Sequence, residues 1–221
     1  MSATGSSDAA QVRLAHPLTG RVLVRNSPAD RVPSHGTDLA ATAYSIDLIP
    51  VDEHGRSGRY TPASFLRPEP PHLFVGFGQP VLAPITGTVR IVHDGEVDHD
   101  AYRGLPSVGY ALTQARRVRQ GWDLVAGNHV VIQAASASRA DGHEDVFVAL
   151  CHLQRASPTV RVGQQIAAGE MIGRCGNSGN STEPHMHLQA MTAQDATRAK
   201  ALPITFMDGL PRAGQILEAR G

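Results

Sequence analysis

Two histidines at alternate positions end a loop of small and turn-forming residues. His185 and His187 stand in residues 183–188, which read as a short extended segment, and the loop before them spans residues 176–182. Side chains at positions i and i+2 of a strand point to the same face of a sheet. Both imidazoles can therefore reach one small volume, which is a natural start for a zinc site. The alternative is a pair of solvated histidines on an edge strand.

Short apolar segments precede this loop. Residues 146–153 form an apolar segment with His152 near its end, and glycines divide residues 162–173 in the manner of a β-hairpin. A period of two predicts that Cys151 and His152 face opposite ways. We therefore expect the thiol to pack inward and the imidazole to turn toward the glycine-rich loop.

The composition favours one β-rich domain over two equal domains. The chain has 221 residues, 41% of them hydrophobic, and its 22 glycines and 15 prolines are spread as turn punctuation. Lys plus Arg and Asp plus Glu both number 20, so no basic excess favours a nucleic acid or an anionic membrane as partner. No apolar run is long enough to span a bilayer.

Five segments resemble, in the same order, those of the lysostaphin-like or LytM-type zinc metallopeptidases, bacterial enzymes that cut peptide bonds in peptidoglycan. They are residues 79–89, 127–132 and 150–153, the glycine hairpin at 162–173, and the loop with the histidine pair at 176–187. The resemblance implies an all-β domain of antiparallel sheets, with the duplicated, barrel-sandwich-like hairpin motif of that family. It is interrupted at about residues 94–126, where residues 110–119 predict a helix-bearing insertion.

The resemblance also suggests how the chain is divided. We expect an N-terminal arm and first strand at residues 1–30, the LytM-type domain at residues 31–200, and a C-terminal extension at residues 201–221. Lipoyl and biotinyl carrier domains share the hairpin style. They require a lysine at a hairpin tip, however, and the only lysine in the chain is Lys200.

The site residues of the family can be carried over by position. The resemblance implies that His187 binds zinc, while His185 and His152 deprotonate the attacking water and stabilise the oxyanion. A zinc-bound water has a pKa near neutrality, and a nearby imidazole can accept its proton. The implied activity is that of a zinc-dependent endopeptidase acting on peptidoglycan-like peptides with small residues.

The first half of the ligand set departs from the family pattern. The family motif is H-x-x-x-D; Asp47 matches its aspartate, but Ala43 stands where its histidine belongs. His35 lies in a turn-rich stretch upstream and is the candidate replacement, which completes a Zn²⁺ site of His35, Asp47 and His187. The alternative is a loop histidine hydrogen-bonded to backbone. The chain would then be a catalytically inactive module that binds peptidoglycan or activates another enzyme.

Further features concern the environment of the chain. Residues 1–11 lack the basic start and apolar stretch of a secretory signal, so we expect an extracytoplasmic protein if a leader has been lost and a cytoplasmic one otherwise.

Cys151 and Cys175 are expected to be free buried thiols rather than a disulfide. The oligomeric state is left open. His129 is expected to line the cleft without binding zinc. Tyr110 and Trp122, which flank the insertion, are candidates for a substrate wall; the alternative is packing, which is the commoner role of a single tryptophan beside a sheet.

Overall fold

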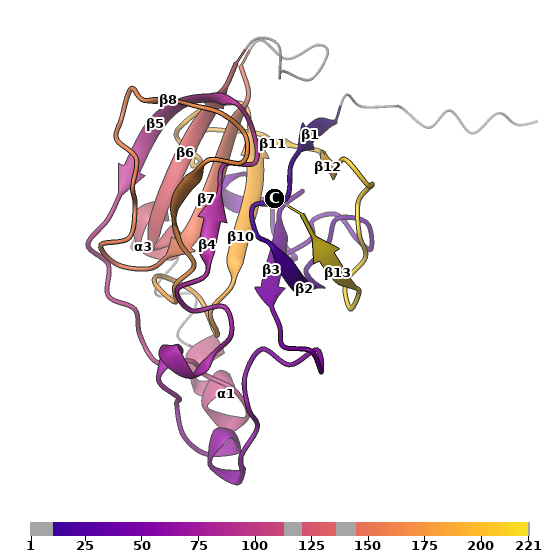
Figure 1. Ribbon diagram of the computed structural model, residues 1–221, viewed down its shortest axis with the longest axis vertical. Helices are drawn as coiled ribbons and strands as arrows, with labels where there is room; N and C mark the ends of the chain where they lie inside the picture. Colours follow the sequence, from indigo (N-terminus) through magenta and orange to yellow (C-terminus); the bar gives the residue numbers. More distant parts are fainter. Residues whose placement is uncertain (1–10, 113–120, 136–144, 221) are drawn as a thin grey trace, which may run out of the picture.

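The computed structural model describes residues 11–112, 121–135 and 145–220, the side chains of residues 111 and 112 excepted. Its strands, shown in Figure 1, are β1 (Val12–Leu14), β2 (Gly20–Arg25), β3 (Ile46–Pro50), β4 (Pro80–Leu82), β5 (Gly87–His93), β6 (Asn128–Ala134), β7 (Phe147–Leu153), β8 (Gln165–Ile166), β9 (Met171–Arg174), β10 (Met186–Met191), β11 (Ala201–Leu202), β12 (Ile204–Phe206) and β13 (Ile216–Ala219). Its helices are α1 (Leu105–Leu112) and α3 (Trp122–Ala126), with 3-10 turns η1 (Leu39–Ala41), η2 (Pro62–Phe65) and η3 (Pro71–Leu73).

Most strands belong to one large sheet. Its order is β13, β2, β3, β10, β7, β6, β5 and β8, and β11 pairs with β10. All of these pairings are antiparallel. Outside this sheet, β4 and β9 form an antiparallel pair, and β1 and β12 form a parallel one. The predicted all-β antiparallel fold is confirmed, with the β1–β12 pair as an exception.

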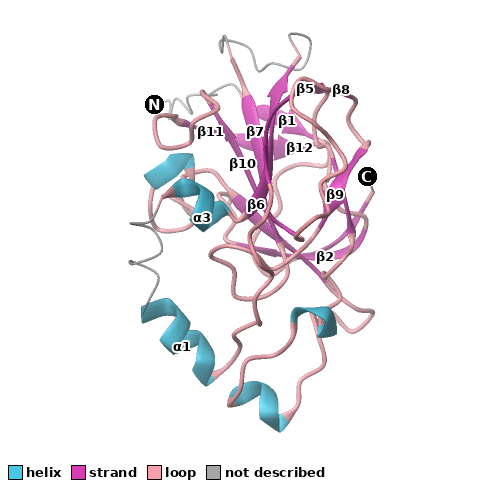
Figure 2. Cartoon of the chain, turned by 90° about the vertical axis from the view of Figure 1, so that its left-hand side faces the viewer, coloured by secondary structure: helices cyan, strands magenta, loops and turns pink. Residues whose placement is uncertain are grey.

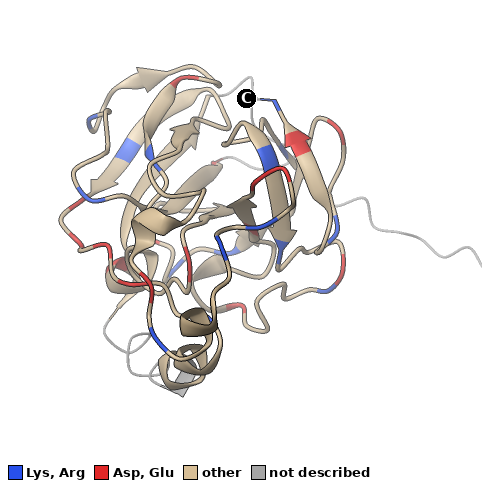
Figure 3. Ribbon diagram, turned by 60° about the horizontal axis from the view of Figure 1, so that its bottom comes forward, with Lys and Arg blue, Asp and Glu red and all other residues tan. Residues whose placement is uncertain are grey.

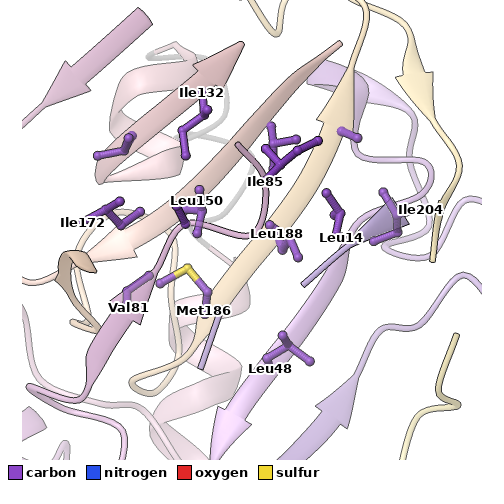
Figure 4. Close-up of a cluster of buried hydrophobic side chains, with 14 of the residues drawn as sticks. Leu14, Leu48, Val81, Ile85, Ile132, Leu150, Ile172, Met186, Leu188 and Ile204 are labelled. Atoms are coloured by element: carbon purple, nitrogen blue, oxygen red, sulfur yellow. The ribbon is translucent and has the colours of Figure 1, made fainter. Parts of the chain in front are cut away.

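One face of the sheet builds the hydrophobic core. Alternation along β10 turns Met186 and Leu188 into this core, and alternation along β3 does the same for Leu48. Burying each such side chain stabilises the fold by roughly 1.5–3 kcal/mol. Figure 4 shows how segments far apart in the sequence meet there, through Leu14, Leu48, Val81, Ile85, Ile132, Leu150, Ile172, Met186, Leu188 and Ile204.

The helices lie in the connection between two paired strands. β5 and β6 are antiparallel neighbours paired as far as His93 and His129, and the chain between them carries α1 and α3. In Figures 1 and 2, α1 lies at one end of the molecule, beyond the strands, whereas α3 lies close to the sheet. The fold thus contains the predicted helix-bearing excursion. The predicted helix was expected to continue over residues 113–119, which lie outside the described residues.

The segments predicted as an arm and an extension both contribute strands. β2 lies between β13 and β3 in the large sheet, and β1 pairs with β12. The expected boundaries near residues 30 and 200 therefore do not coincide with a break in the sheet. They remain predictions as domain boundaries.

The distribution of charged residues and the state of the two cysteines agree with what the sequence predicts. Figure 3 shows acidic and basic residues interspersed along the chain rather than gathered by sign. Cys151 and Cys175 are both buried and free. Among the described helices, none is long and apolar enough to cross a membrane.

Candidate active site

The site begins as a row of side chains on the face of the sheet opposite the core. Across the ladders β10–β3 and β10–β7, His187 lies opposite both Asp47 and Cys151. The residues on either side of His187 along the strand, Met186 and Leu188, point into the core. Alternation therefore turns Asp47, His187 and Cys151 to the other face, side by side on three adjacent strands.

His35 reaches this row from a closed loop. The Ser34 N–H donates to the carbonyl oxygen of Ala43 at 2.9 Å, which joins the two ends of residues 35–42. This closure places His35 Nε2 at 3.0 Å from Asp47 Oδ2. The imidazole thus arrives beside the position where the family motif has its histidine and this chain has Ala43.

Hydrogen-bond partners decide which ring nitrogens face the site. Ser45 Oγ donates to the carbonyl oxygen of Thr42 at 2.7 Å and therefore accepts from His35 Nδ1–H at 2.8 Å. His187 Nε2–H donates to Gln189 Oε1 at 3.0 Å. The proton positions follow from these partners. They leave lone pairs on His35 Nε2 and His187 Nδ1.

Three possible ligand atoms converge at this point. One atom each from His35, Asp47 and His187 lies within 4.8 Å of the others. The side-chain amide of Asn26 donates to Asp47 Oδ2 at 2.7 Å and so orients the carboxylate. Two imidazole nitrogens and one carboxylate oxygen match the donor set of a catalytic zinc site with three protein ligands. The three candidate ligands are therefore brought together, and their lone pairs fit a zinc ion.

Two further histidines lie beside this cluster. His185 Nδ1–H donates to the carbonyl oxygen of Glu183 at 2.8 Å, and His185 Nε2 lies 3.6 Å from Asp47 Oδ1. His152 Nδ1–H donates to the carbonyl oxygen of Ser178 at 2.9 Å, and its ring centroid lies 4.8 Å from that of His185. Each carbonyl fixes one ring nitrogen, so Nε2 is the atom left for proton transfer.

The expectation that the Cys151 thiol is buried and that the His152 imidazole turns toward the glycine-rich loop is confirmed, but the prediction that the two face opposite ways is wrong. Both line the same cavity. The register of the β6–β7 ladder shifts between Asn128 and Val130, so that two residues of β7 oppose the single residue His129. This arrangement is a β-bulge, a device that re-aims side chains next to active sites. His152 has a φ of 65°, outside extended geometry, and this breaks the alternation on which the prediction depended.

Burial and neighbouring rings shift the pKa values in the cluster. Burial raises the pKa of Asp47, but the His35 and His185 rings outweigh it and hold this pKa well below its usual value. Burial lowers the pKa of His152 well below its usual value, and the His185 and His187 rings lower it further. Burial also lowers the pKa of His185, yet the Asp47 carboxylate reverses this and raises it. The lowered pKa values therefore favour an ionised Asp47 carboxylate beside a neutral His152 imidazole.

The histidines open into a cavity of about 560 Å³, a volume typical of ligand sites. Leu39 from η1, Tyr110 from α1 and Trp122 from α3 contribute to its walls. Of the two alternatives for Tyr110 and Trp122, the structure therefore favours the cavity wall. His129 does not line the cavity as expected, because it is fully buried and stacks on His93 with ring centroids 5.1 Å apart.

Residues that hold the ligands were not identified from the sequence. Gln189 stands two positions after His187, so the same alternation that relates His185 to His187 could have identified it. Asn26 follows β2, whose last residue pairs with Asp47. No local pattern relates Asn26 to Asp47, and only the strand pairing brings them together.

Comparisons with known proteins identify related peptidases. Residues 93–199 match Peptidase family M23. The chain is 30% identical over 98 residues to glycyl-glycine endopeptidase ALE-1 of Staphylococcus capitis, which covers 44% of this chain and 25% of that protein. It is 29% identical over 107 residues to lysostaphin of Staphylococcus simulans, which covers 47% and 20%. The match thus spans a quarter or less of these relatives' lengths. The predicted resemblance to lysostaphin-like peptidases is confirmed.

Solved structures of such peptidases are also similar. The catalytic domain of lysostaphin from Staphylococcus simulans gives a TM-score of 0.39 at 19% identity, over 72% of this chain and 74% of that one. A variant catalytic domain of the prophage-encoded M23 protein EnpA from Enterococcus faecalis gives 0.37 at 18% identity, over 67% and 81%. The family match at residues 93–199 does not include His35 or Asp47. Their assignment therefore depends on the motif comparison and on the geometry above.

Proposed function

We propose that this chain, which carries a lysostaphin-like M23 peptidase region, is a zinc-dependent endopeptidase. One observation carries the proposal: ligand atoms of His35, Asp47 and His187 lie within 4.8 Å of one another, next to the rings of His152 and His185. Hydrolysis of a peptide bond by a zinc enzyme needs such a ligand set and an adjacent proton acceptor.

The residues of the cluster divide the reaction between them. His35 Nε2, His187 Nδ1 and the Asp47 carboxylate would hold zinc, which, when bound, supplies Lewis acidity and lowers the pKa of water. His152 and His185 each offer Nε2 to the cavity, because Nδ1–H is tied to a backbone carbonyl. One imidazole takes the proton of the attacking water, and the other, when protonated, donates a hydrogen bond to the oxyanion. Both protons of the water end on the leaving nitrogen, the first through the imidazole that accepts it and the second when the new carboxyl group ionises, so one peptide bond and one water become a carboxylate and an ammonium group.

We propose a peptidoglycan-like peptide with small residues, such as glycine or alanine, as the substrate. One relative is named a glycyl-glycine endopeptidase, which supports small residues at the bond. The described residues that line the cavity include no Lys, Arg or Glu, which suits an uncharged peptide. Tyr110 and Trp122 from the insertion add bulky side chains to the cavity wall. Short peptides should therefore be better substrates than an intact cell wall.

Hydrolysis of short peptides tests this proposal. Protein stripped of metal with a chelator is incubated with glycine- and alanine-containing peptides, with and without added zinc, and the products are identified by mass spectrometry. We expect cleavage only after zinc is restored, and weak clearing of a purified peptidoglycan suspension. Failure of the zinc-loaded protein to cleave any such peptide contradicts the proposed activity, whereas strong clearing of the suspension contradicts only the restriction to short substrates.

The second candidate function is a catalytically inactive module that binds peptidoglycan or activates another enzyme. Ala43 at the usual ligand position favours it, because family members that lack a ligand lose their metal. The approach of His35 to Asp47 at 3.0 Å argues against it. Elemental analysis of protein purified without added zinc separates the two, since an inactive module should carry no zinc in a defined ratio.

A further inference from the structure

We propose that the insertion between β5 and β6 positions the catalytic imidazole of His152, and that His99 and Tyr110 are its positioning residues. This inference extends the proposed function, because it assumes that His152 transfers a proton during peptide hydrolysis. The insertion would then be part of the catalytic apparatus as well as a wall of the cavity.

The orientation of His152 depends on one carbonyl group. His152 lies in the β7 bulge with a φ of 65°, so strand geometry does not fix the direction of its ring. The contact that does so is the hydrogen bond from His152 Nδ1–H to the carbonyl oxygen of Ser178, at 2.9 Å. Any shift of this carbonyl changes both the direction of the ring and the nitrogen that carries its proton.

Ser178 belongs to the glycine-rich loop, which is anchored on one side to the sheet and to α3. Ser178 Oγ donates to the carbonyl oxygen of Leu153 at 2.8 Å and accepts from the N–H of Asn128 at 3.0 Å. Asn180 N–H donates to the carbonyl oxygen of Val125 at 2.9 Å. These bonds hold the inner side of the loop independently of His99 and Tyr110.

The first part of the insertion, with His99 and Tyr110, contacts the other side of the same loop. The carbonyl oxygen of Gly179, one residue after Ser178, lies 2.9 Å from His99 Nε2 and accepts from the Tyr110 hydroxyl at 3.1 Å. Gly179 has a φ of 72°, and a side chain there would collide with the backbone of Gly127. No side chain at this position can therefore hold the loop by packing, and hydrogen bonds to its backbone take that role. The Tyr110 hydroxyl is a donor to the Gly179 carbonyl oxygen, and His99 Nε2 is a second donor when it carries the ring proton, because Nδ1 also lies 2.8 Å from the carbonyl oxygen of Asp100 and a neutral imidazole has one N–H. Both groups are therefore placed to fix the peptide group that follows the Ser178 carbonyl.

Further bonds join the two segments around this contact. His99 N–H donates to the carbonyl oxygen of Asn177 at 3.2 Å, and the Asn177 side-chain amide donates back to the carbonyl oxygen of His99 at 2.8 Å. Tyr102 N–H donates to the carbonyl oxygen of Thr182 at 2.7 Å, and the Tyr102 ring stacks on that of Tyr110 at 4.5 Å. The insertion thus runs along the loop and presents His99 and Tyr110 as one unit.

The test compares variants that remove single donors from the zinc-loaded full chain. His99→Ala removes the imidazole, Tyr110→Phe removes one hydroxyl and keeps the ring, and His99→Gln restores an N–H donor at a similar reach. His72→Ala, at an exposed position of η3, is the matched control. We expect His99→Ala and Tyr110→Phe to lower kcat by about 10- to 100-fold, with KM within about twofold and zinc content unchanged. His99→Gln should recover most of the loss, and the control should lose nothing.

A readout independent of turnover accompanies the kinetics. The Nδ1–H proton of His152, assigned by NMR through its loss in His152→Gln, should be protected from solvent exchange in the wild type and in His99→Gln, but exchange faster in His99→Ala. If the wild type hydrolyses no peptide, the proposed function fails, and this resonance alone decides the positioning role. Unchanged kcat with an unchanged resonance in both His99→Ala and Tyr110→Phe would overturn the inference, as would an effect on KM alone. If His99→Ala does not fold, Tyr110→Phe decides.

Discussion

At the scale of single residues, hydrogen bonds fix four imidazole rings around one point. Each ring gives one nitrogen to an acceptor outside the cluster, namely Ser45 Oγ for His35, Gln189 Oε1 for His187, and the carbonyl oxygens of Glu183 and Ser178 for His185 and His152. A histidine with one nitrogen so committed is held in one tautomer, with the other nitrogen available. The chemistry available to the site therefore depends on these partners as much as on the rings.

The proposed roles of the alternating histidines are separable by substitution. His187→Ala should remove stoichiometric zinc, because it deletes a ligand atom, while His185→Ala should retain zinc and lose hydrolysis. His152→Ala should also retain zinc and reduce turnover by about two to four orders of magnitude, the range expected for general acid–base catalysis. Elemental analysis and peptide turnover of the purified variants check this. Equal zinc loss in the His185 and His187 variants would mean that the roles are assigned wrongly.

Asn26 provides a second prediction at this scale. Asn26→Gly removes the amide that donates to Asp47 Oδ2 and keeps a residue suited to the backbone φ of 49°. Loss of such a support for a ligand should weaken zinc affinity by about 10- to 100-fold. Competition with a chromophoric chelator measures this affinity. Asn26→Ala, which adds backbone strain, should be no tighter than Asn26→Gly, and wild-type affinity in Asn26→Gly would exclude the supporting role.

At the scale of elements, the region around α1 is held together by a partly buried ion pair. Arg103, just before α1, forms two hydrogen bonds of 2.8 Å with Glu69 and lies over the rings of Tyr60 and Phe74. Backbone bonds between Glu69 and Ala101 reinforce the contact. Because α1 also carries Tyr110, this pair anchors the insertion that borders the cavity.

Replacing Glu69 tests how much this anchor contributes. Glu69→Ala leaves the Arg103 guanidinium without its carboxylate, and because the pair is only partly buried we expect a loss of about 1–3 kcal/mol, below the cost for a fully buried pair. Glu69→Gln keeps an acceptor and should cost less. Denaturant unfolding of the three proteins measures the difference. A Glu69→Ala variant as stable as the wild type would show that the ion pair does not support the fold.

The same pair predicts a pH dependence of stability. Burial raises the pKa of Glu69, but its hydrogen bonds to Arg103 and Ser64 outweigh burial, and the net pKa lies below its ordinary value of 4.5. The stabilisation is therefore fully present above pH 4.5 and is lost as the pH falls through the lower folded-state pKa. The stability gap between wild type and Glu69→Gln should shrink below that pH. A gap that stays constant down to pH 3 contradicts this pKa direction.

Sequence patterns predicted those parts of the fold and site that depend on local alternation. The period of two related His185 to His187. The glycine spacing of residues 162–173 indicated two short strands, but the predicted hairpin is wrong, because β8 pairs with β5 and β9 pairs with β4 rather than with each other. Alternation failed for Cys151 and His152, because a bulge depends on the register between two strands and not on either strand alone. Asn26 could not be found because its contact with Asp47 depends on pairing between β2 and β3.

At the scale of the whole molecule, the candidate ligands come from separated parts of the chain. His35 lies in a closed loop, Asp47 on β3, and His187 on β10, so the cluster exists only when the large sheet is assembled. An unfolded chain does not bring these three side chains together. Zinc should therefore bind the folded state preferentially and stabilise it.

The effect of zinc on thermal unfolding follows from this linkage. Zinc at about 100 times its dissociation constant should add roughly 2.7 kcal/mol of stability. For a chain of this size that corresponds to a rise in Tm of roughly 5–10 °C. Differential scanning calorimetry with zinc and with a chelator measures the shift, and His35→Ala should lose most of it while keeping its sheet by circular dichroism. Equal Tm values for the wild type with zinc and with chelator would contradict preferential binding of zinc to the folded state.

The most direct test of the account is a zinc-edge anomalous difference map from crystals grown or soaked with zinc. We predict one strong peak about 2 Å from His35 Nε2, His187 Nδ1 and a carboxylate oxygen of Asp47, with His152 and His185 beside it but not bound. A peak between Asp47 and His187 without the imidazole of His35 would contradict the ligand assignment. The absence of any peak there would contradict the proposed enzyme and favour the inactive module.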